Sequence, residues 1–352
     1  MRNDNKEYNK MRSTFLFLIT CILLLSGCKN NTTDSKNYFT IFGFAQGTTY
    51  KITYHDKNRR NLKPEIEDIL QKFEKSLSVY DSTSIISRVN RNEDVEVDDY
   101  FIELFNRSAE ITKKTNGAFD ISGEPLYLAW GFSRKNKISM DSLKVDSLMQ
   151  YVGMDKIHLD GRKVIKSNPN VVINGNAVAK GYSTDVVAKF LDSKGCMNYM
   201  VEIGGEMKLK GKNSEGKEWH IAIDYPVDGN YEPGVNVLVI IKVTDKGMAT
   251  SGNYRRFYME GDKKIGHTIN PKTGYPASHN LLSCTVIAND CLTADAFASA
   301  FLVVGLDSAR RWVQKFPELD AYFIYDDNGE LKSDYTKGIE TAIIEVKKEQ
   351  TE

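Results

Sequence analysis

Short strand-forming runs, placed too irregularly for repeated strand–helix–strand units, limit the fold of this chain most strongly. They lie at 48–54, 198–204, 219–225, 235–243, 281–288 and 321–327. Each run is rich in β-branched and aromatic residues, which pack well on a pleated surface. Strands that outnumber a regular alternation with helices favour an α+β fold. The sequence therefore predicts mainly antiparallel or mixed sheets flanked by helices.

Five further segments carry the three- and four-residue apolar spacing of helices. They begin at Pro64, near Asp98, near Asp141, at Ala177 and at Thr293, and the last two end at Gly195 and Gly305. Proline at the start of a helix and glycine at its end are typical boundaries. The segment near Asp141 is expected to pack through Leu143, Leu148 and Val152. No GxGxxG sequence follows a strand and opens a helix, which argues against a Rossmann site.

Residues 1–27 are predicted to be a lipoprotein signal peptide. Basic residues precede the apolar run 15–25, which is shorter than the roughly 20 residues that a transmembrane helix needs. The sequence LSGC then ends at Cys28 and is similar to a bacterial lipobox, which implies cleavage before Cys28 and acylation of its thiol. An uncleaved apolar anchor is the alternative. Residues 28–37 are expected to form a flexible tether. The signal peptide and the acylated Cys28 together predict a protein on the periplasmic face of the cell envelope, anchored to a membrane by lipid.

The remaining chain, residues 38–345, is long enough for one large domain or two closely associated ones, and a single domain is predicted. Lysine plus arginine and aspartate plus glutamate are equal at 47 each, so no basic surface for nucleic acid is expected. Beyond the signal peptide and Cys28 the cysteines are Cys196, Cys284 and Cys291. An odd number excludes a complete disulfide framework. Buried thiols are the simplest interpretation, and a bond between Cys284 and Cys291 stays open.

Asp295 and Ser299 are the sharpest candidate for a metal site. They are four residues apart on a predicted helix and therefore share one face. A carboxylate and a hydroxyl, with backbone carbonyls and water, suit Mg²⁺. The structural alternative is a helix N-terminal interaction for Asp295 and a packed small residue for Ser299. His267 is a candidate functional residue of another kind, because it lies in a rigid bend beside turn-forming Asn, Pro and Gly residues. The structural alternative is a turn with an incidental surface histidine.

Eight segments occur in an order that closely resembles the ApbE family, the FAD:protein FMN transferases. They are QGTTY, SLSVYDSTSIISRVN, NGAFDISGEPLYLAWGF, NAVAKGYSTD, VEIGGEM, ATSGNYRRF, HTINPKTGYP and CLTADAFASA. The resemblance covers about residues 40–325 and implies an ApbE-like fold. It also implies a Mg²⁺-dependent enzyme with FAD as substrate. Such an enzyme transfers the FMN part of FAD to a threonine hydroxyl of an acceptor flavoprotein subunit and releases AMP.

The resemblance assigns roles to particular residues. It makes Asp295, Ser299 and the carbonyl of Ala177 the Mg²⁺ ligands, and His267 the residue most closely tied to transfer. The FAD-contacting positions are Thr48, Tyr80, Lys180, Glu202, Gly204, Gly205, Ser251, Gly252, Arg255 or Arg256, and Thr273. Asn270 stands where the family usually has aspartate, which removes a carboxylate that could orient the imidazole.

Two other functions are compatible with parts of this pattern. If water replaced the threonine, the same residues would make a Mg²⁺-dependent FAD diphosphatase that releases FMN and AMP. A non-catalytic flavin-binding lipoprotein is the other alternative. Retention of His267, Asp295 and Ser299 argues against it, because binding alone does not require a metal at the pyrophosphate.

Overall fold

One antiparallel sheet of eight strands organises the computed structural model, which describes residues 35–132, 140–226, 234–254, 257–260 and 263–346. Its strands in spatial order are β1 (Tyr38–Ala45), β2 (Thr48–His55), β5 (Tyr199–Ile203), β6 (Glu206–Lys210), β9 (Lys246–Gly252), β12 (Leu281–Ala288), β13 (Asp320–Asp327) and β14 (Glu330–Tyr335). Each strand runs antiparallel to its neighbours. The predicted α+β class is confirmed.

Two tight hairpins fix the register of this sheet near the candidate site. Gln46 and Gly47 join β1 to β2 with φ values of 53° and 74°. Gly204 and Gly205 join β5 to β6 with φ values of 63° and 101°. Left-handed residues in two-residue turns match the twist of the strands, and glycine takes that conformation without steric cost. The second turn places Glu206 at the first position of β6.

Three smaller sheets complete the strand content of the described residues. They are β15 (Ile343–Val346) with β8 (Val237–Val243) and β7 (Trp219–Asp224), β10 (Phe257–Glu260) with β11 (Lys263–Gly266), and β3 (Ile157–Asp160) with β4 (Lys163–Lys166). The three-stranded sheet packs on one face of the large sheet. Its Ile221 and Val239 belong to the same buried cluster as Leu209 of β6 and Ile324 of β13.

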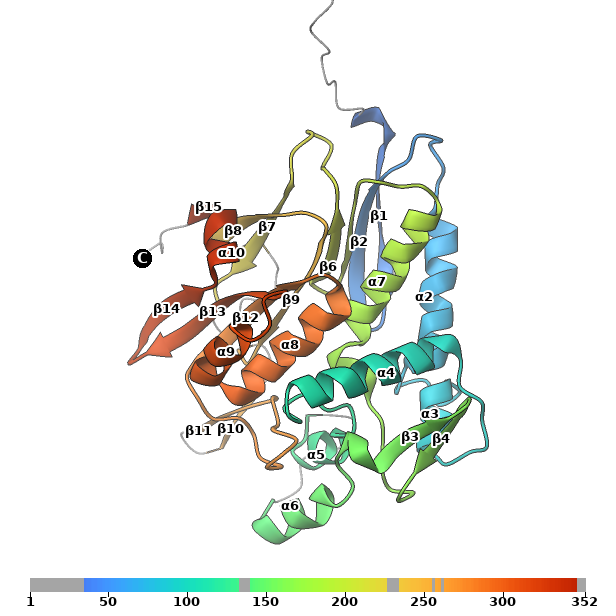
Figure 1. Cartoon of the computed structure of the whole chain (residues 1–352), viewed down its shortest axis with the longest axis vertical. Helices are drawn as coiled ribbons and strands as arrows, with labels where there is room; N and C mark the ends of the chain where they lie inside the picture. Colours follow the sequence, from blue (N-terminus) through green and yellow to red (C-terminus); the bar gives the residue numbers. More distant parts are fainter. Residues whose placement is uncertain (1–34, 133–139, 227–233, 255–256, 261–262, 347–352) are drawn as a thin grey trace, which may run out of the picture. The chain divides into compact units, whose positions relative to one another are not determined.

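Helices cover the opposite face of the large sheet. The helices of the described chain are α2 (Lys63–Leu77), α3 (Ile85–Asn90), α4 (Asp99–Lys114), α5 (Glu124–Ala129), α6 (Ser142–Met149), α7 (Ala179–Ser193), α8 (Cys291–Val304), α9 (Leu306–Val313) and α10 (Lys337–Ala342), with 3₁₀ turns η1 (Ser35–Asn37), η2 (Met154–Lys156) and η3 (Gly175–Ala177). Helix α10 is an exception, because its Ile339 packs with the three-stranded sheet. Figure 1 shows α7 and α8 across this face, with α2 beside α7. Val187 of α7 packs with Val201 of β5, and Phe297 of α8 with Val286 of β12. Within the described ranges, no helix combines the length and apolar character that crossing a bilayer demands.

Most helix boundaries agree with the sequence pattern. Helices α4 and α6 begin beside Asp98 and Asp141, as expected, and the side chains of these residues cap them. Gly195 and Gly305 follow α7 and α8 with φ values of 80° and 77°, a conformation that ends helices. Helix α8 begins at Cys291, two residues before the expected start.

The predicted packing face of α6 is wrong at Leu143 and right at Leu148 and Val152. Leu143 is 79% exposed, whereas Val145 is buried and packs with Leu148 and Met149. Residues 145, 148 and 149 are three and four positions apart and therefore share a face. Val152 is buried but lies beyond the end of the helix. A helix of only eight residues gave too few turns to define its face by periodicity.

All three described cysteines are buried free thiols. The bond between Cys284 and Cys291 that the sequence left open is therefore not formed. Burial raises the pKa of both thiols well above the ordinary value. These residues pack as small apolar side chains, as the odd cysteine count indicated.

Helices α7 and α8 approach one another unusually closely. A Cβ atom at Gly181 would lie 2.6 Å from the carbonyl oxygen of Cys291 and 2.8 Å from Cβ of Asp295. The Gly181 N–H donates to Oδ2 of Asp295 at 3.1 Å. One turn further along α7, the Asp185 carboxylate accepts the N–H groups of Cys291 and Leu292 at 2.9 and 2.8 Å. Glycine at position 181 is therefore required for this helix spacing.

Replacing Gly181 with alanine should separate the two helices. We expect Gly181→Ala to lower the free energy of unfolding by about 1–3 kcal/mol, because the added methyl group overpacks a buried contact. Urea denaturation measures this change. Lys189→Ala, on the exposed side of the same helix, is the matched control. Equal stability of the two variants would contradict the close-contact interpretation.

Candidate active site

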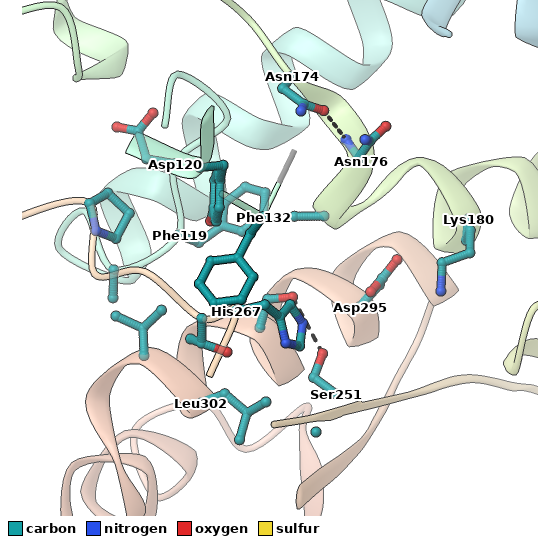
Figure 2. Close-up of a pocket in the computed structure, with 18 of the residues that line it drawn as sticks. Phe119, Asp120, Phe132, Asn174, Asn176, Lys180, Ser251, His267, Asp295 and Leu302 are labelled. Atoms are coloured by element: carbon teal, nitrogen blue, oxygen red, sulfur yellow. Dashed lines mark hydrogen bonds between the residues drawn. The ribbon is translucent and has the colours of Figure 1, made fainter. Parts of the chain in front are cut away.

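A cavity of about 360 Å³ lies between the start of α7, α8, the end of β9 and the loop that carries His267. Its size falls in the range of roughly 300–1,000 Å³ that is common for small-molecule sites. Figure 2 shows Phe119 and Phe132 on one side, Lys180 and Asp295 on the other, and His267 between them. The cavity therefore has an aromatic end and a charged end.

The aromatic end is formed by residues from two separate segments. Phe119 and Phe132 come from the segment before α6, and Leu302 comes from the end of α8. The Phe132 ring stacks on Tyr258 at a centroid distance of 5.2 Å and meets the His267 ring edge-on at 6.4 Å. Flat aromatic surfaces of this kind suit a planar heterocycle, which gains both apolar burial and ring contact.

The charged end contains two acidic side chains and one lysine. Nζ of Lys180 lies 2.5 Å from Oε1 of Glu206. Burial raises the pKa of Asp295 well above its usual range, and the neighbouring Glu206 raises it further while Lys180 opposes the shift. Burial alone would lower the pKa of Lys180, but the Glu206 and Asp295 carboxylates raise it, so the ammonium stays charged. Two carboxyl groups and one ammonium are thus held close together at this end.

Oxygen donors line the same end of the cavity. Asp295 and Ser299 both face it from α8. The Ser299 hydroxyl lies 3.4 Å from that of Ser251, at the end of β9. Ala177, at the end of η3, completes the predicted set. The predicted metal-ligating residues are therefore brought to one place, although Ala177 and Asp295 are 118 positions apart in the chain.

Turn chemistry positions Ala177. The side chain of Asn174 accepts the N–H of Asn176 at 2.9 Å and donates to Oε2 of Glu124 at 2.5 Å. Nδ2 of Asn176 in turn donates to the hydroxyl of Tyr80 at 3.2 Å. This network ties η3 to α5 and to the segment before α3. The asparagines of INGNA thus hold the backbone at the rim of the cavity.

The loop that carries His267 is a closed turn, as its Asn, Pro and Gly residues predict. Ile269 and Pro276 form a β-bridge across its neck. The side-chain oxygen of Asn270 accepts the N–H of Lys272 at 2.9 Å. An aspartate in this position could make the same bond, so the departure from the family pattern leaves the turn intact. His267 is held at the cavity wall by this loop.

The structure gathers most, but not all, of the predicted site residues. Those that line the cavity are Tyr80, Ala177, Lys180, Gly204, Ser251, Gly252, His267, Asp295 and Ser299. Thr48 lies beside Gly204, where its Cγ2 atom is 2.8 Å from the position of an added Cβ. Thr273 is exposed, and its hydroxyl accepts the N–H of Tyr275 at 3.4 Å. Arg255, Arg256 and Cys28 lie outside the described residues.

Glu202 and Gly205 lie in the β5–β6 hairpin but do not line the cavity. The Glu202 carboxylate accepts the N–H of Gly205 at 2.8 Å, which stabilises the turn.

The sequence pattern did not predict three residues that line the cavity, which are Glu206 and the aromatic residues Phe119 and Phe132. Both phenylalanines belong to the NGAFDISGEPLYLAWGF segment. The place of this segment in the motif order indicated the family, but it did not indicate which of its side chains face the cavity.

The donor set at the charged end fits a magnesium ion. Within the described residues, no three His, Cys, Asp or Glu side chains lie close enough together to hold a metal ion. Mg²⁺ needs no such group, because it binds one or two carboxylates together with water and phosphate oxygens. Asp295, Ser299 and the Ala177 carbonyl supply oxygen donors of this kind. In addition, the buried oxygen Oε2 of Glu206 has no hydrogen-bond partner in the described structure.

Comparisons with known proteins agree with this geometry. The model of the ApbE family matches residues 46–323. The FAD:protein FMN transferase of Haemophilus influenzae is 34% identical over 329 residues, which are 89% of this chain and 93% of that protein. The FAD:protein FMN transferase of Vibrio cholerae is 32% identical over 83% of this chain and 87% of that protein.

Solved structures give the same result. The flavin transferase ApbE from Vibrio cholerae superposes with a TM-score of 0.77 at 29% identity, covering 87% of this chain and 99% of that one. The apo form of the Pseudomonas stutzeri flavinyl transferase ApbE gives a TM-score of 0.78 at 27% identity, with 87% and 96% covered. The fold and site thus define a flavin transferase. The chain belongs to the ApbE family of FAD:protein FMN transferases.

Proposed function

We propose that this protein transfers the FMN part of FAD to a threonine hydroxyl of an acceptor flavoprotein in a Mg²⁺-dependent reaction that releases AMP. One observation carries the proposal: a single cavity joins an aromatic end to an end rich in oxygen donors, with His267 between them. An isoalloxazine ring matches the first end and a pyrophosphate with its cation matches the second. Membership of the family and the names of its relatives support the same activity.

In this reaction an oxygen–phosphorus bond forms between the threonine Oγ and the FMN phosphorus. The pyrophosphate bond on the other side of that phosphorus breaks, and AMP leaves. Asp295, Ser299 and the Ala177 carbonyl would hold Mg²⁺. When bound, the ion neutralises charge on the pyrophosphate and makes AMP a better leaving group.

The side chains supply the remaining functions. Lys180 adds positive charge where phosphate oxygens gather, which favours transfer through electrostatic stabilisation. Phe119 and Phe132 orient the flavin ring and exclude water from that end. His267 accepts the proton from the threonine hydroxyl, because imidazole is the side chain best suited to proton transfer near neutral pH. The loop around His267 fixes the imidazole against the substrate.

His267→Ala should retain FAD binding and lose transfer. Loss of a positioned acid–base group typically lowers a rate about 10²- to 10⁴-fold. Mass spectrometry of a threonine-containing acceptor peptide, incubated with enzyme, FAD and Mg²⁺, measures the FMN adduct. FAD affinity is measured in the same preparation. His158→Ala, an exposed histidine on β3, is the matched control.

The same experiment separates the alternatives. Adduct on the wild-type acceptor supports the transferase. FMN and AMP without adduct would instead indicate a diphosphatase, and unchanged FAD a non-catalytic flavin-binding protein. Near-normal adduct formation by His267→Ala would restrict that histidine to a structural role.

We also propose that Cys28 carries a lipid that anchors the protein to the extracytoplasmic side of a bacterial membrane. The apolar run before it and the polar segment after it support this localisation. Cys28→Ala should move the protein from the membrane fraction to the soluble fraction. Cys21→Ala, which changes a cysteine inside the apolar run, should not. A Cys28→Ala protein that still sediments with membranes in high salt would refute the anchor.

A further inference from the structure

Glu206 occupies a position that neither the motif order nor the metal pattern singles out. It is the first residue of β6 and follows the Gly204–Gly205 turn directly. Its side chain lines the cavity, although the residue is only 4% exposed. The hairpin register pairs it with Ile203, and residues paired across two strands project to the same face of the sheet. The carboxylate is therefore held on the helix-covered face, beneath α7.

The two oxygens of this carboxylate are in different situations. Oε1 is bound by Nζ of Lys180 at 2.5 Å. Oε2 is buried and has no hydrogen-bond partner in the described structure. An unsatisfied buried acceptor is costly, and most strongly so when it is charged. A partner supplied through the cavity would remove that cost.

The local charge balance indicates the sign of that partner. Glu206 and Asp295 are both acidic, and Lys180 is the cation that contacts Glu206. Two carboxyl groups therefore share a single ammonium at this end of the cavity, and a bound cation would favour their ionised forms. Asp295 already receives the Gly181 N–H on Oδ2, so the two carboxylates are each anchored through one oxygen. A hard cation with oxygen ligands matches both the charge and the donor type.

We propose that Glu206 is a second carboxylate of the Mg²⁺ site and binds the cation through Oε2. Lys180 holds the other oxygen and thereby orients the carboxylate. This inference rests on the proposed function, because it concerns the same site. It adds a ligand from the β5–β6 hairpin to those from α8 and η3. The cation site then links the sheet to the helix layer.

Mg²⁺ affinity tests the role of Glu206 separately from catalysis. Glu206→Gln keeps the size of the side chain and an oxygen for Lys180, but an amide nitrogen cannot replace Oε2 as a ligand. We expect the Mg²⁺ dissociation constant to rise about 10- to 100-fold. Isothermal titration calorimetry with Mg²⁺ is performed on the protein alone and saturated with FAD. Glu318→Gln removes the same charge at an exposed position and should leave the constant unchanged.

A second readout does not depend on turnover. Mg²⁺ should raise the Tm of the wild-type protein and of Glu318→Gln. The rise should be much smaller for Glu206→Gln, because a ligand stabilises the folded protein less when it binds more weakly. The Tm in EDTA reports whether each variant is folded. Should Glu206→Gln fail to fold, Glu206→Asp, which withdraws the carboxylate by one methylene group, is expected to weaken Mg²⁺ binding in the same way.

Asp295→Asn separates failure of this inference from failure of the proposed function. Weak Mg²⁺ binding in Asp295→Asn together with wild-type binding in Glu206→Gln would overturn the role of Glu206 and leave the transferase proposal in place. Absence of Mg²⁺ binding by the wild-type protein, with and without FAD, would overturn both. Weakened binding in both variants, with normal binding in Glu318→Gln, supports the inference.

Discussion

The close contact between α7 and α8 is the interaction on which the site depends. Lys180 lies on the first helix and Asp295 on the second, so the distance between the helix axes sets the separation of these charges. Only glycine at position 181 permits that distance, and its N–H binds Asp295 directly. Asp185 then fixes the first turn of α8 by accepting two of its N–H groups, which otherwise lack partners within the helix.

This packing creates a site that is electrostatically incomplete by itself. Burial raises the pKa of Asp295, and the neighbouring carboxylate of Glu206 adds to the shift. Lys180 opposes this shift only in part, and a bound cation would favour the ionised carboxylate. A cation bound to the oxygen donors, together with the phosphates of a nucleotide, would balance these charges. Ligand binding would therefore stabilise this region of the fold. The aromatic end has no comparable deficit, and in the proposed function it binds and orients the flavin ring.

Local patterns predicted the elements of the fold better than their arrangement. Helical spacing and caps located α2, α4, α7 and α8, because those signals lie within a few residues of one another. The order of strands in the large sheet depends on long-range pairing, which no local pattern reports. The Gly181–Asp295 bond likewise joins residues 114 positions apart. The family resemblance located the segments that meet at the cavity, but not which side chains face it.

The two glutamates of EIGGE illustrate that limit. Residues 202 and 203 are adjacent in β5 and therefore point to opposite faces. Glu206 is paired with Ile203 and shares its face, whereas Glu202 is paired with Met207, which packs toward the three-stranded sheet. The cavity accordingly receives Glu206 and not Glu202. Recognising Gly-Gly as a two-residue turn would have fixed this register from the sequence.

The central claim is that the charged end of this cavity binds a divalent cation beside FAD. Crystals grown with FAD and Mn²⁺, an oxygen-preferring ion that can stand in for Mg²⁺, test it by anomalous diffraction. We predict one strong anomalous peak within coordination distance of Asp295, Ser299 and the Ala177 carbonyl, with the flavin ring against Phe119 and Phe132. A peak elsewhere on the protein, or FAD bound in the cavity with no cation at these oxygens, would contradict the account.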